Sequence, residues 1–397
     1  MNDLVLKDSP FVAKLQKFAL GALAIGGIGT ILSLLIGDPD PIKRFMANYI
    51  IAFMYFGGIA VTAVFFSALQ YLVRAGWSAS VRRIPEMFAG FVPVLVILIL
   101  PIIAAGFGFS HIYHWVHPEG DALLKLKEPY LNTIFFVLRL AFYVASWFLM
   151  YRYIVGNSFK QDAMPNDYTP TIRNRVRAAP FIFLYALTFS FAAFDILMSL
   201  EPHWFSTIFG VHIFAGSWVA TLALITIFTI YLMRGGYLKN FVTVEHLHDL
   251  GKLMFAFNIF WTYITFSQYF LIWYANIPEE TVYYIHRNEH GWQYLAYALV
   301  AIHFVIPFFL LIRQDAKRKQ LTLLIGSFIF LFAHYLDLAF IVLPVIGKGG
   351  FFFGWQEIVV FVAMMGLFFF IVARQFATRN IIAINDPYIP ESIELVS

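Results

Sequence analysis

Residues 319–343 read KQLTLLIGSFIFLFAHYLDLAFIVL, an almost uninterrupted apolar run. The hydrocarbon core of a bilayer is about 30 Å thick, and a helix of about 20 apolar residues crosses it. His334 and Asp337 lie inside this run, three residues apart and therefore on one face of a helix. A charged side chain at mid-membrane depth costs about 2.5–3.5 kcal/mol on insertion scales. The stretch therefore predicts a transmembrane helix that carries an expensive polar pair, and such pairs are typical of functional sites.

The rest of the chain has the same character. Hydrophobic residues make up 61% of the 397 positions, charged residues only 13%, and the mean hydropathy is +0.76. Soluble domains carry about 25% charged residues, so the chain is predicted to be an all-α polytopic membrane protein forming a single integral membrane domain, 1–397. We predict about ten transmembrane helices, at residues 15–37, 45–74, 87–108, 129–155, 179–200, 208–234, 249–275, 291–313, 319–343 and 355–378.

The basic residues predict an orientation. Most Lys and Arg residues fall on one side of this ten-span topology, and the positive-inside rule places that side, with both termini, in the cytoplasm. The pI near 9.0 is explained by these loops, so no nucleic-acid partner is expected. Residues 77–86, between the second and third spans, are predicted to lie flat at the membrane interface.

The chain contains no cysteine. Disulfides, cysteine-ligated iron–sulfur clusters and thioether-attached haem are thereby excluded. We predict no metal site and no covalently bound cofactor.

Ionisable side chains gather in the predicted outer half of the membrane. They lie in spans four, five, eight and nine, with one more histidine near the outer end of span six, and are Arg139, Asp195, His303, His334, Asp337 and His212. Arg139 and Asp195 form either part of a proton relay or a structural ion pair. His303 is either a relay group or an interhelical hydrogen-bond partner, and His212 is either a ligand contact or a solvated group.

Span seven carries a polar stripe. Asn258, Thr262, Thr265 and Gln268 follow helical spacing and share one face, and Asp249 and Lys252 share a face at the inner end. The stripe could hold a chain of waters that conducts protons. Alternatively, its threonines bond to their own backbone, and Asp249 with Lys252 caps the helix.

Three stretches resemble one family. FDILMSLEPHWFST (194–207), HDLGKLM (248–254), and FSQY (266–269) followed by IWYANIPEET (272–281) are similar to NrfD/PsrC-type integral membrane subunits of bacterial respiratory complexes. More narrowly, they resemble the shorter of the two such subunits of alternative complex III, a quinol:cytochrome c (or high-potential protein) oxidoreductase, the ActF type. The resemblance extends from span two to span ten and is most specific between about residues 185 and 285.

The resemblance implies two four-helix bundles, a place in the bacterial cytoplasmic (inner) membrane, and an accessory rather than catalytic role. It implies as partners a paralogous NrfD-like quinol-binding subunit, a multihaem cytochrome c subunit, an iron–sulfur subunit and a terminal oxidase. Haem and iron–sulfur centres would sit on those partners. Menaquinone or another quinol is a candidate ligand near the outer face, with Asp195, His212, His334 and Asp337 as candidate contacts, although the longer paralogue carries the better-supported quinol site.

Other functions fit the same residues. A secondary transporter also needs intramembrane charge. A b-type cytochrome would use His303 and His334 as axial ligands, and a structural scaffold would use the polar groups only to hold helices together. We prefer a respiratory subunit whose buried groups relay protons.

Overall fold

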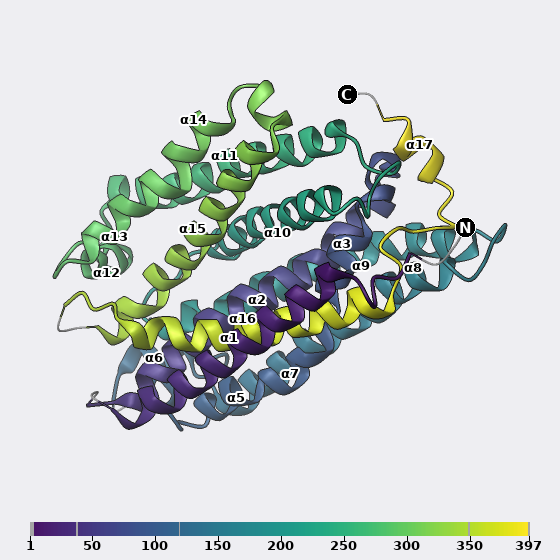
Figure 1. The fold of residues 1–397 in the computed structure, drawn as a ribbon. Coiled ribbons are helices and arrows are strands. Elements are labelled where there is room, and N and C mark those ends of the chain that lie inside the picture. Colours follow the sequence, from purple (N-terminus) through teal and green to yellow (C-terminus); the bar gives the residue numbers. More distant parts are fainter. Residues whose placement is uncertain (1–3, 37–38, 119, 348–349, 396–397) are drawn as a thin grey trace.

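The computed structural model describes residues 4–36, 39–118, 120–347 and 350–395, and these residues form a helical bundle (Figure 1). The helices are α1 (Pro10–Leu35), α2 (Pro41–Leu72), α3 (Arg83–Ala89), α4 (Leu95–Leu98), α5 (Leu100–Gly106), α6 (Ala122–Lys127), α7 (Thr133–Met150), α8 (Gly156–Gln161), α9 (Thr169–Ile196), α10 (Phe209–Arg234), α11 (Val244–Ala275), α12 (Pro278–Arg287), α13 (Trp292–Leu299), α14 (Ile306–Leu311), α15 (Gln320–Ile346), α16 (Trp355–Thr378) and α17 (Ile389–Ile393).

Nine segments in the described residues are long and apolar enough to cross a membrane, which makes the chain a multi-pass membrane protein. They coincide with nine of the ten predicted spans, although Gly37, the last residue of the first predicted span, lies outside the described residues. The remaining span is α11, which is helical over 32 residues. Its polar stripe lowers its mean hydropathy, and this lower hydropathy is what distinguishes it from the other nine spans.

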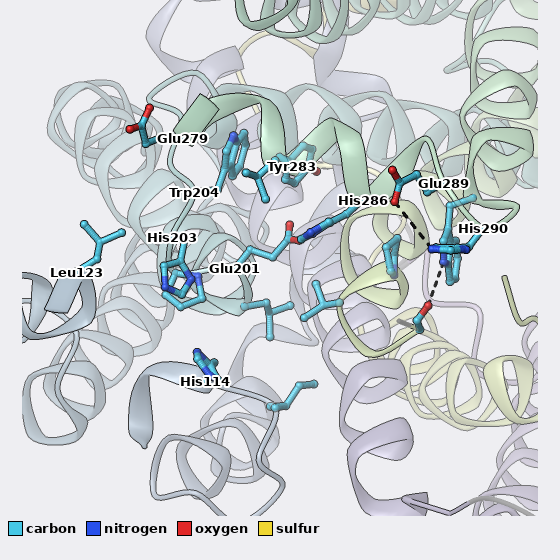
Figure 2. A pocket seen from close by; sticks show the side chains of 18 of the residues that line it. His114, Leu123, Glu201, His203, Trp204, Glu279, Tyr283, His286, Glu289 and His290 are labelled. Atoms are coloured by element: carbon cyan, nitrogen blue, oxygen red, sulfur yellow. Dashed lines mark hydrogen bonds and ion pairs between the residues drawn. The ribbon is translucent and has the colours of Figure 1, made fainter. Parts of the chain in front are cut away.

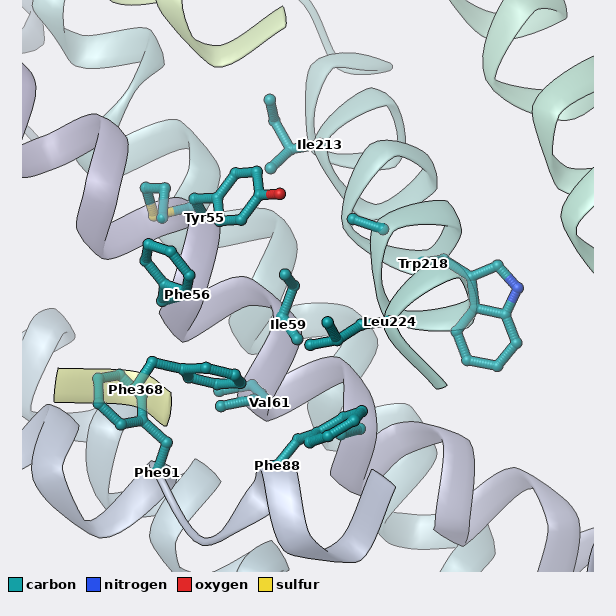
Figure 3. Packing of buried hydrophobic residues seen from close by; sticks show 14 of the residues in the cluster. Tyr55, Phe56, Ile59, Val61, Phe88, Phe91, Ile213, Trp218, Leu224 and Phe368 are labelled. Atoms are coloured by element: carbon teal, nitrogen blue, oxygen red, sulfur yellow. The ribbon is translucent and has the colours of Figure 1, made fainter. Parts of the chain in front are cut away.

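The spans pack in two groups of four with a flanking pair. Helices α2, α3–α5, α7 and α9 contact one another, and so do α10, α11, α13–α14 and α15. Helix α2 also contacts α10 and α15 across the middle, and the most apolar stretch of α2 is entirely buried. Figure 3 shows aromatic and aliphatic side chains such as Phe56, Phe88 and Phe368 filling the space around α2. This grouping agrees with the expected two four-helix bundles.

Helices α1 and α16 form the flanking pair, side by side in Figure 1. Glycines allow the close approach: a Cβ atom added to Gly26 would lie 2.2 Å from the Ala363 backbone nitrogen, and one added to Gly366 would lie 2.4 Å from that of Leu23. Small residues at helix crossings are the usual means of tight packing in lipid. Only 22% of the apolar stretch of α1 is buried in the chain, so its other face is available to lipid.

The two ends of the described chain lie at the same end of the bundle. Leu4 donates its backbone N–H to Asn380, and Val5 forms an isolated β-bridge with Asn380. We call this end the terminal end, and the opposite end, which carries α6 and α12, the distal end. An even number of spans gives this arrangement, and the positive-inside pattern predicts that the distal end faces outward.

Residues 77–86 are covered rather than exposed at the interface. Arg82, Arg83 and Glu86 are at most 2% exposed and form ion pairs with one another, with Asp386 and with Asp162. The C-terminal segment closes over them, and the Ser392 hydroxyl donates to the Trp77 carbonyl. The expectation of a flat interfacial segment did not include this covering segment, which brings the Asp386 carboxylate to Arg82.

Proline shapes the helices at the distal end. Pro344 lies inside α15 and has no N–H to donate to the carbonyl of Phe340. Arg287 takes that place: its Nε donates to the Phe340 carbonyl at 3.0 Å and its Nη2 to the Ile341 carbonyl at 2.6 Å. The eighth span is interrupted by a π-helical turn, Val300–Val305, just before Pro307. Such turns are common at functional sites, and this one contains His303.

Candidate functional site

Asp337 is the centre of a buried polar site between α10, α11 and α15. Its carboxylate is 2% exposed and lies 3.0 and 3.1 Å from Nε2 of His212 on α10. Nε1 of Trp261 on α11 donates to Oδ2 of Asp337 at 3.1 Å. An unpaired carboxylate would be very costly in this apolar setting. Asp337 of α15 avoids this cost because α10 and α11 each provide a hydrogen-bond partner.

His303 extends the site toward the eighth span. Its ring lies parallel to the Trp261 indole, with centroids 3.5 Å apart and 7° between the planes. Its Nδ1 is 3.3 Å from Oδ1 of Asn258, and its Nε2 has no hydrogen-bond partner within the described residues. His303 is fully buried. One indole therefore connects the imidazole of His303 to the carboxylate of Asp337.

His334 lies one helical turn before Asp337 and is 1% exposed. It stacks on Tyr55 of α2, with ring centroids 5.2 Å apart. Neither of its ring nitrogens has a hydrogen-bond partner in the part of the chain that the structure describes. Gly216 of α10 makes room for it, because a Cβ atom there would lie 2.8 Å from Nδ1 of His334 and 3.5 Å from Oδ2 of Asp337. A buried imidazole needs at least one partner, so these nitrogens indicate places for buried water.

Arg139 and Asp195 meet in the other group of helices. Nε and Nη2 of Arg139 on α7 donate to the two carboxylate oxygens of Asp195 on α9, at 2.8 and 2.9 Å. The Tyr143 hydroxyl donates to Asp195 at 2.7 Å, and Nη1 of Arg139 donates to the Tyr130 carbonyl. Within the described residues, no hydrogen bond or ion pair joins this pair to the Asp337 site. The predicted outer-half groups therefore form two sites.

The polar stripe of α11 is divided among several partners. Thr262 donates to the Asn258 carbonyl of its own helix, which matches the structural alternative. Thr265 is half-buried, and its buried hydroxyl has no partner among the described residues. Gln268 accepts from Ser206 and donates to the Tyr284 hydroxyl of α12. The stripe therefore runs from the Asp337 site toward the distal end.

At the terminal end of α11, Lys252 and Asp249 form an ion pair with 2.5 Å between Nζ and Oδ1. The Lys252 side chain is half exposed. Among the described residues, no hydrogen bond or ion pair connects this pair to Asn258. It is therefore a separate feature at the helix end.

Trp261 and Tyr143, which were not among the predicted site residues, both donate to buried carboxylates. Trp261 is three residues from Asn258 and therefore on the face of the stripe, which was the available signal. Tyr143 is four residues after Arg139 and shares its face in the same way. Both were overlooked because an aromatic residue in an apolar span is usually a packing residue. His212, a predicted candidate contact for a quinol, is buried and not solvated.

The haem alternative for His303 and His334 stays a prediction. Trp261 stacks on the face of the His303 ring and Tyr55 on that of His334, whereas a haem iron binds an imidazole through an in-plane ring nitrogen. In the part of the chain that the structure describes, no cluster of three or more His, Asp or Glu side chains is arranged to hold a metal ion.

No protein family model matches the chain, and no curated protein matches it in sequence. The fold and the site define an all-α multi-pass membrane protein with two buried polar sites. Its function must be argued from those sites.

Proposed function

We propose that this chain is a membrane subunit of a respiratory quinol:electron-acceptor oxidoreductase of the alternative complex III type, and that its Asp337 site exchanges protons during turnover. The type of complex is supported by the resemblance of residues 194–207, 248–254 and 266–281 to NrfD/PsrC-type subunits. In this proposal the redox centres and the main quinol site belong to partner subunits, and the chain sits in the bacterial cytoplasmic membrane.

One observation carries the proton role: Asp337 is a buried carboxylate whose neighbours are imidazoles and an indole. A proton can move between a carboxylate and an imidazole at hydrogen-bond distance, because neither state leaves an isolated charge. Nδ1 of His212, Nε2 of His303 and both ring nitrogens of His334 have no partner among the described residues. Water at these positions would connect the groups into a path.

Arg139 and Asp195 favour a structural role in the same protein. Asp195 is held by two guanidinium hydrogen bonds and a tyrosine hydroxyl. The guanidinium also lies over the rings of Tyr130 and Phe135, at 3.9 and 4.3 Å from their centroids. Protonating Asp195 would leave the Arg139 charge uncompensated. We therefore assign the pair to holding α7 against α9 rather than to the relay.

The variant Asp337→Asn tests the proposal. It keeps the shape and one hydrogen-bond acceptor but cannot take up a proton at a carboxylate. We expect the complex to assemble with its full set of cofactors, while quinol oxidation or the number of protons released per electron falls. Glu280→Gln on α12 is the matched acid-to-amide control, because Glu280 is half-buried at the distal surface. Wild-type turnover and proton release in Asp337→Asn would overturn the proposal.

A further inference from the structure

A cavity of about 820 Å³ lies at the distal end, between the loop after α9, helix α12 and the end of α15 (Figure 2). Its wall includes Glu201, Trp204, Tyr283, His286 and Pro344. Titratable groups are frequent in this wall, with three glutamates and five histidines among the described residues. It is therefore a polar chamber at the end of the helix that carries His334 and Asp337.

Glu201 connects this cavity to α15 through Arg287. Nη1 of Arg287 donates to Oε2 of Glu201 at 2.7 Å, while the rest of the guanidinium binds the carbonyls of Phe340 and Ile341. These two carbonyls lie three and four residues after Asp337. On the cavity side, Nδ1 of His286 is 3.4 Å from Oε1 of Glu201. Each oxygen of Glu201 therefore faces a different neighbour, one buried and one half exposed.

An aromatic partition separates the cavity from the Asp337 site. The Trp204 and Tyr283 rings stack with centroids 4.0 Å apart, and the Arg287 guanidinium lies 3.5 Å from the Tyr283 centroid. Behind them Trp204 packs on Phe209, which packs on His212. Nε1 of Trp204 is buried and has no hydrogen-bond partner among the residues described. A buried indole N–H without a partner indicates an acceptor that completes the site, and water is the simplest one.

We propose that this cavity is the outlet of the Asp337 site, and that His286, held in place by Glu201, passes the proton from the buried site to the water outside. This inference rests on the proposed proton-exchange function and adds its route. A proton leaves the His212–Asp337 pair and crosses the Trp204–Tyr283 partition through water. The His286 imidazole, oriented by the Glu201 carboxylate, takes the proton from that water and releases it to water in the cavity.

The charges around the pair favour an anionic Glu201 and a proton on His286. The hydrogen bond to Glu201 raises the pKa of the His286 imidazole above its usual value, while partial burial opposes the rise. Burial would raise the pKa of Glu201, but the charge of Arg287 and the hydrogen bonds of His286 and Arg287 together lower it. Other groups face the pair: Arg287, Tyr283 and Glu289 from its own side, and Lys43, His114 and His203 from the opposite wall.

Cysteine labelling tests the water-filled outlet without reference to turnover, because the chain contains no cysteine of its own. Val345→Cys places a thiol in the cavity wall, and Phe332→Cys places one on the exposed face of the same helix at mid-span. A membrane-impermeant cationic thiosulfonate reagent applied from outside should modify Val345→Cys at least about tenfold faster than Phe332→Cys, because only a thiol in water ionises readily. Equal rates would overturn the outlet.

The second experiment measures proton release by the assembled complex in vesicles. His286→Asn should slow outward proton release on the order of tenfold or more, as expected for loss of a general acid–base group. Glu201→Gln should slow it as well, because the positioning contact with His286 is lost. His286 is half exposed, so its replacement leaves the fold intact even if Glu201→Gln disturbs Arg287. Glu279→Gln is the matched control, because Glu279 lines the same cavity.

The two proposals fail in different ways. If the wild-type complex releases no protons, the proposed function fails whatever the cavity does. If the wild type and Glu279→Gln release protons and both Glu201→Gln and His286→Asn match them, the outlet fails and the Asp337 site stands. Slower release in both variants, with assembly unchanged, supports the outlet.

Discussion

Two buried aspartates in this protein have opposite surroundings. Asp195 is bound by a guanidinium with two hydrogen bonds, whereas Asp337 faces imidazole and indole groups. Arginine is always charged and fixes its carboxylate as an anion. Imidazole changes its charge near neutral pH. A single neighbouring side chain, Arg139 for Asp195 and His212 for Asp337, therefore decides whether the carboxylate has a structural or a proton-exchange role.

Asp195→Asn should destabilise the protein by about 3–5 kcal/mol, because it leaves the buried Arg139 charge without its partner. The double variant Arg139→Gln with Asp195→Asn should recover part of that loss, because it removes the uncompensated charge. Thermal unfolding of the detergent-solubilised protein, followed by tryptophan fluorescence, measures both. If the single variant were as stable as the wild type, the Arg139–Asp195 ion pair would not hold α7 against α9.

The Glu201–His286 contact should make the attachment of α12 depend on pH. The folded pKa of His286 is raised, so its contribution is present below the unfolded value and is lost as the pH rises through the folded value. The pKa of Glu201 is lowered, so its contribution is lost only in acid. The protection factors of residues 278–287, which are corrected for the intrinsic pH dependence of hydrogen exchange, should fall on the alkaline side, and His286→Asn should remove this fall. An unchanged pH dependence in the variant would contradict it.

At the scale of helices, glycine controls how closely α1 approaches α16. Gly26→Ala should cost about 1–3 kcal/mol, because its methyl group would overlap the α16 backbone and the helices would have to separate. Gly27→Ala is the matched control, since nothing lies within 4 Å of the position its Cβ would take. Thermal stability in detergent compares them. Equal stabilities would show that the α1–α16 contact is looser than described.

Arg287 of α12 compensates for the backbone hydrogen bond that Pro344 cannot make in α15. Arg287→Gln should destabilise the distal end, because the carbonyls of Phe340 and Ile341 lose their donors. Pro344→Ala restores an N–H that can bond to the Phe340 carbonyl, so Arg287→Gln should cost less in that background. A double-mutant cycle on thermal stability measures the coupling. Strictly additive effects would mean that the Arg287 guanidinium does not replace the hydrogen bond that Pro344 removes.

At the scale of the whole molecule, the sequence predicted the membrane topology well and the site only in part. Membrane spans follow from local hydropathy, and nine of the predicted spans are long and apolar enough to cross a membrane. The hydropathy of α11 is lower than that of the other spans because this helix carries the polar stripe. The division into two sites could not be predicted, because Arg139–Asp195 and His212–Asp337 pair across helices distant in sequence. Trp261 was missed since its indole N–H acts only where α15 brings Asp337 to it.

The most direct test of the account is whether Asp337 changes its protonation during turnover. Infrared difference spectroscopy of the complex, with and without quinol, detects the carbonyl band of a protonated carboxyl group. The account predicts a difference band that moves with isotope-labelled aspartate, is absent in Asp337→Asn and persists in Asp249→Asn. An identical difference spectrum in Asp337→Asn and the wild type would contradict it.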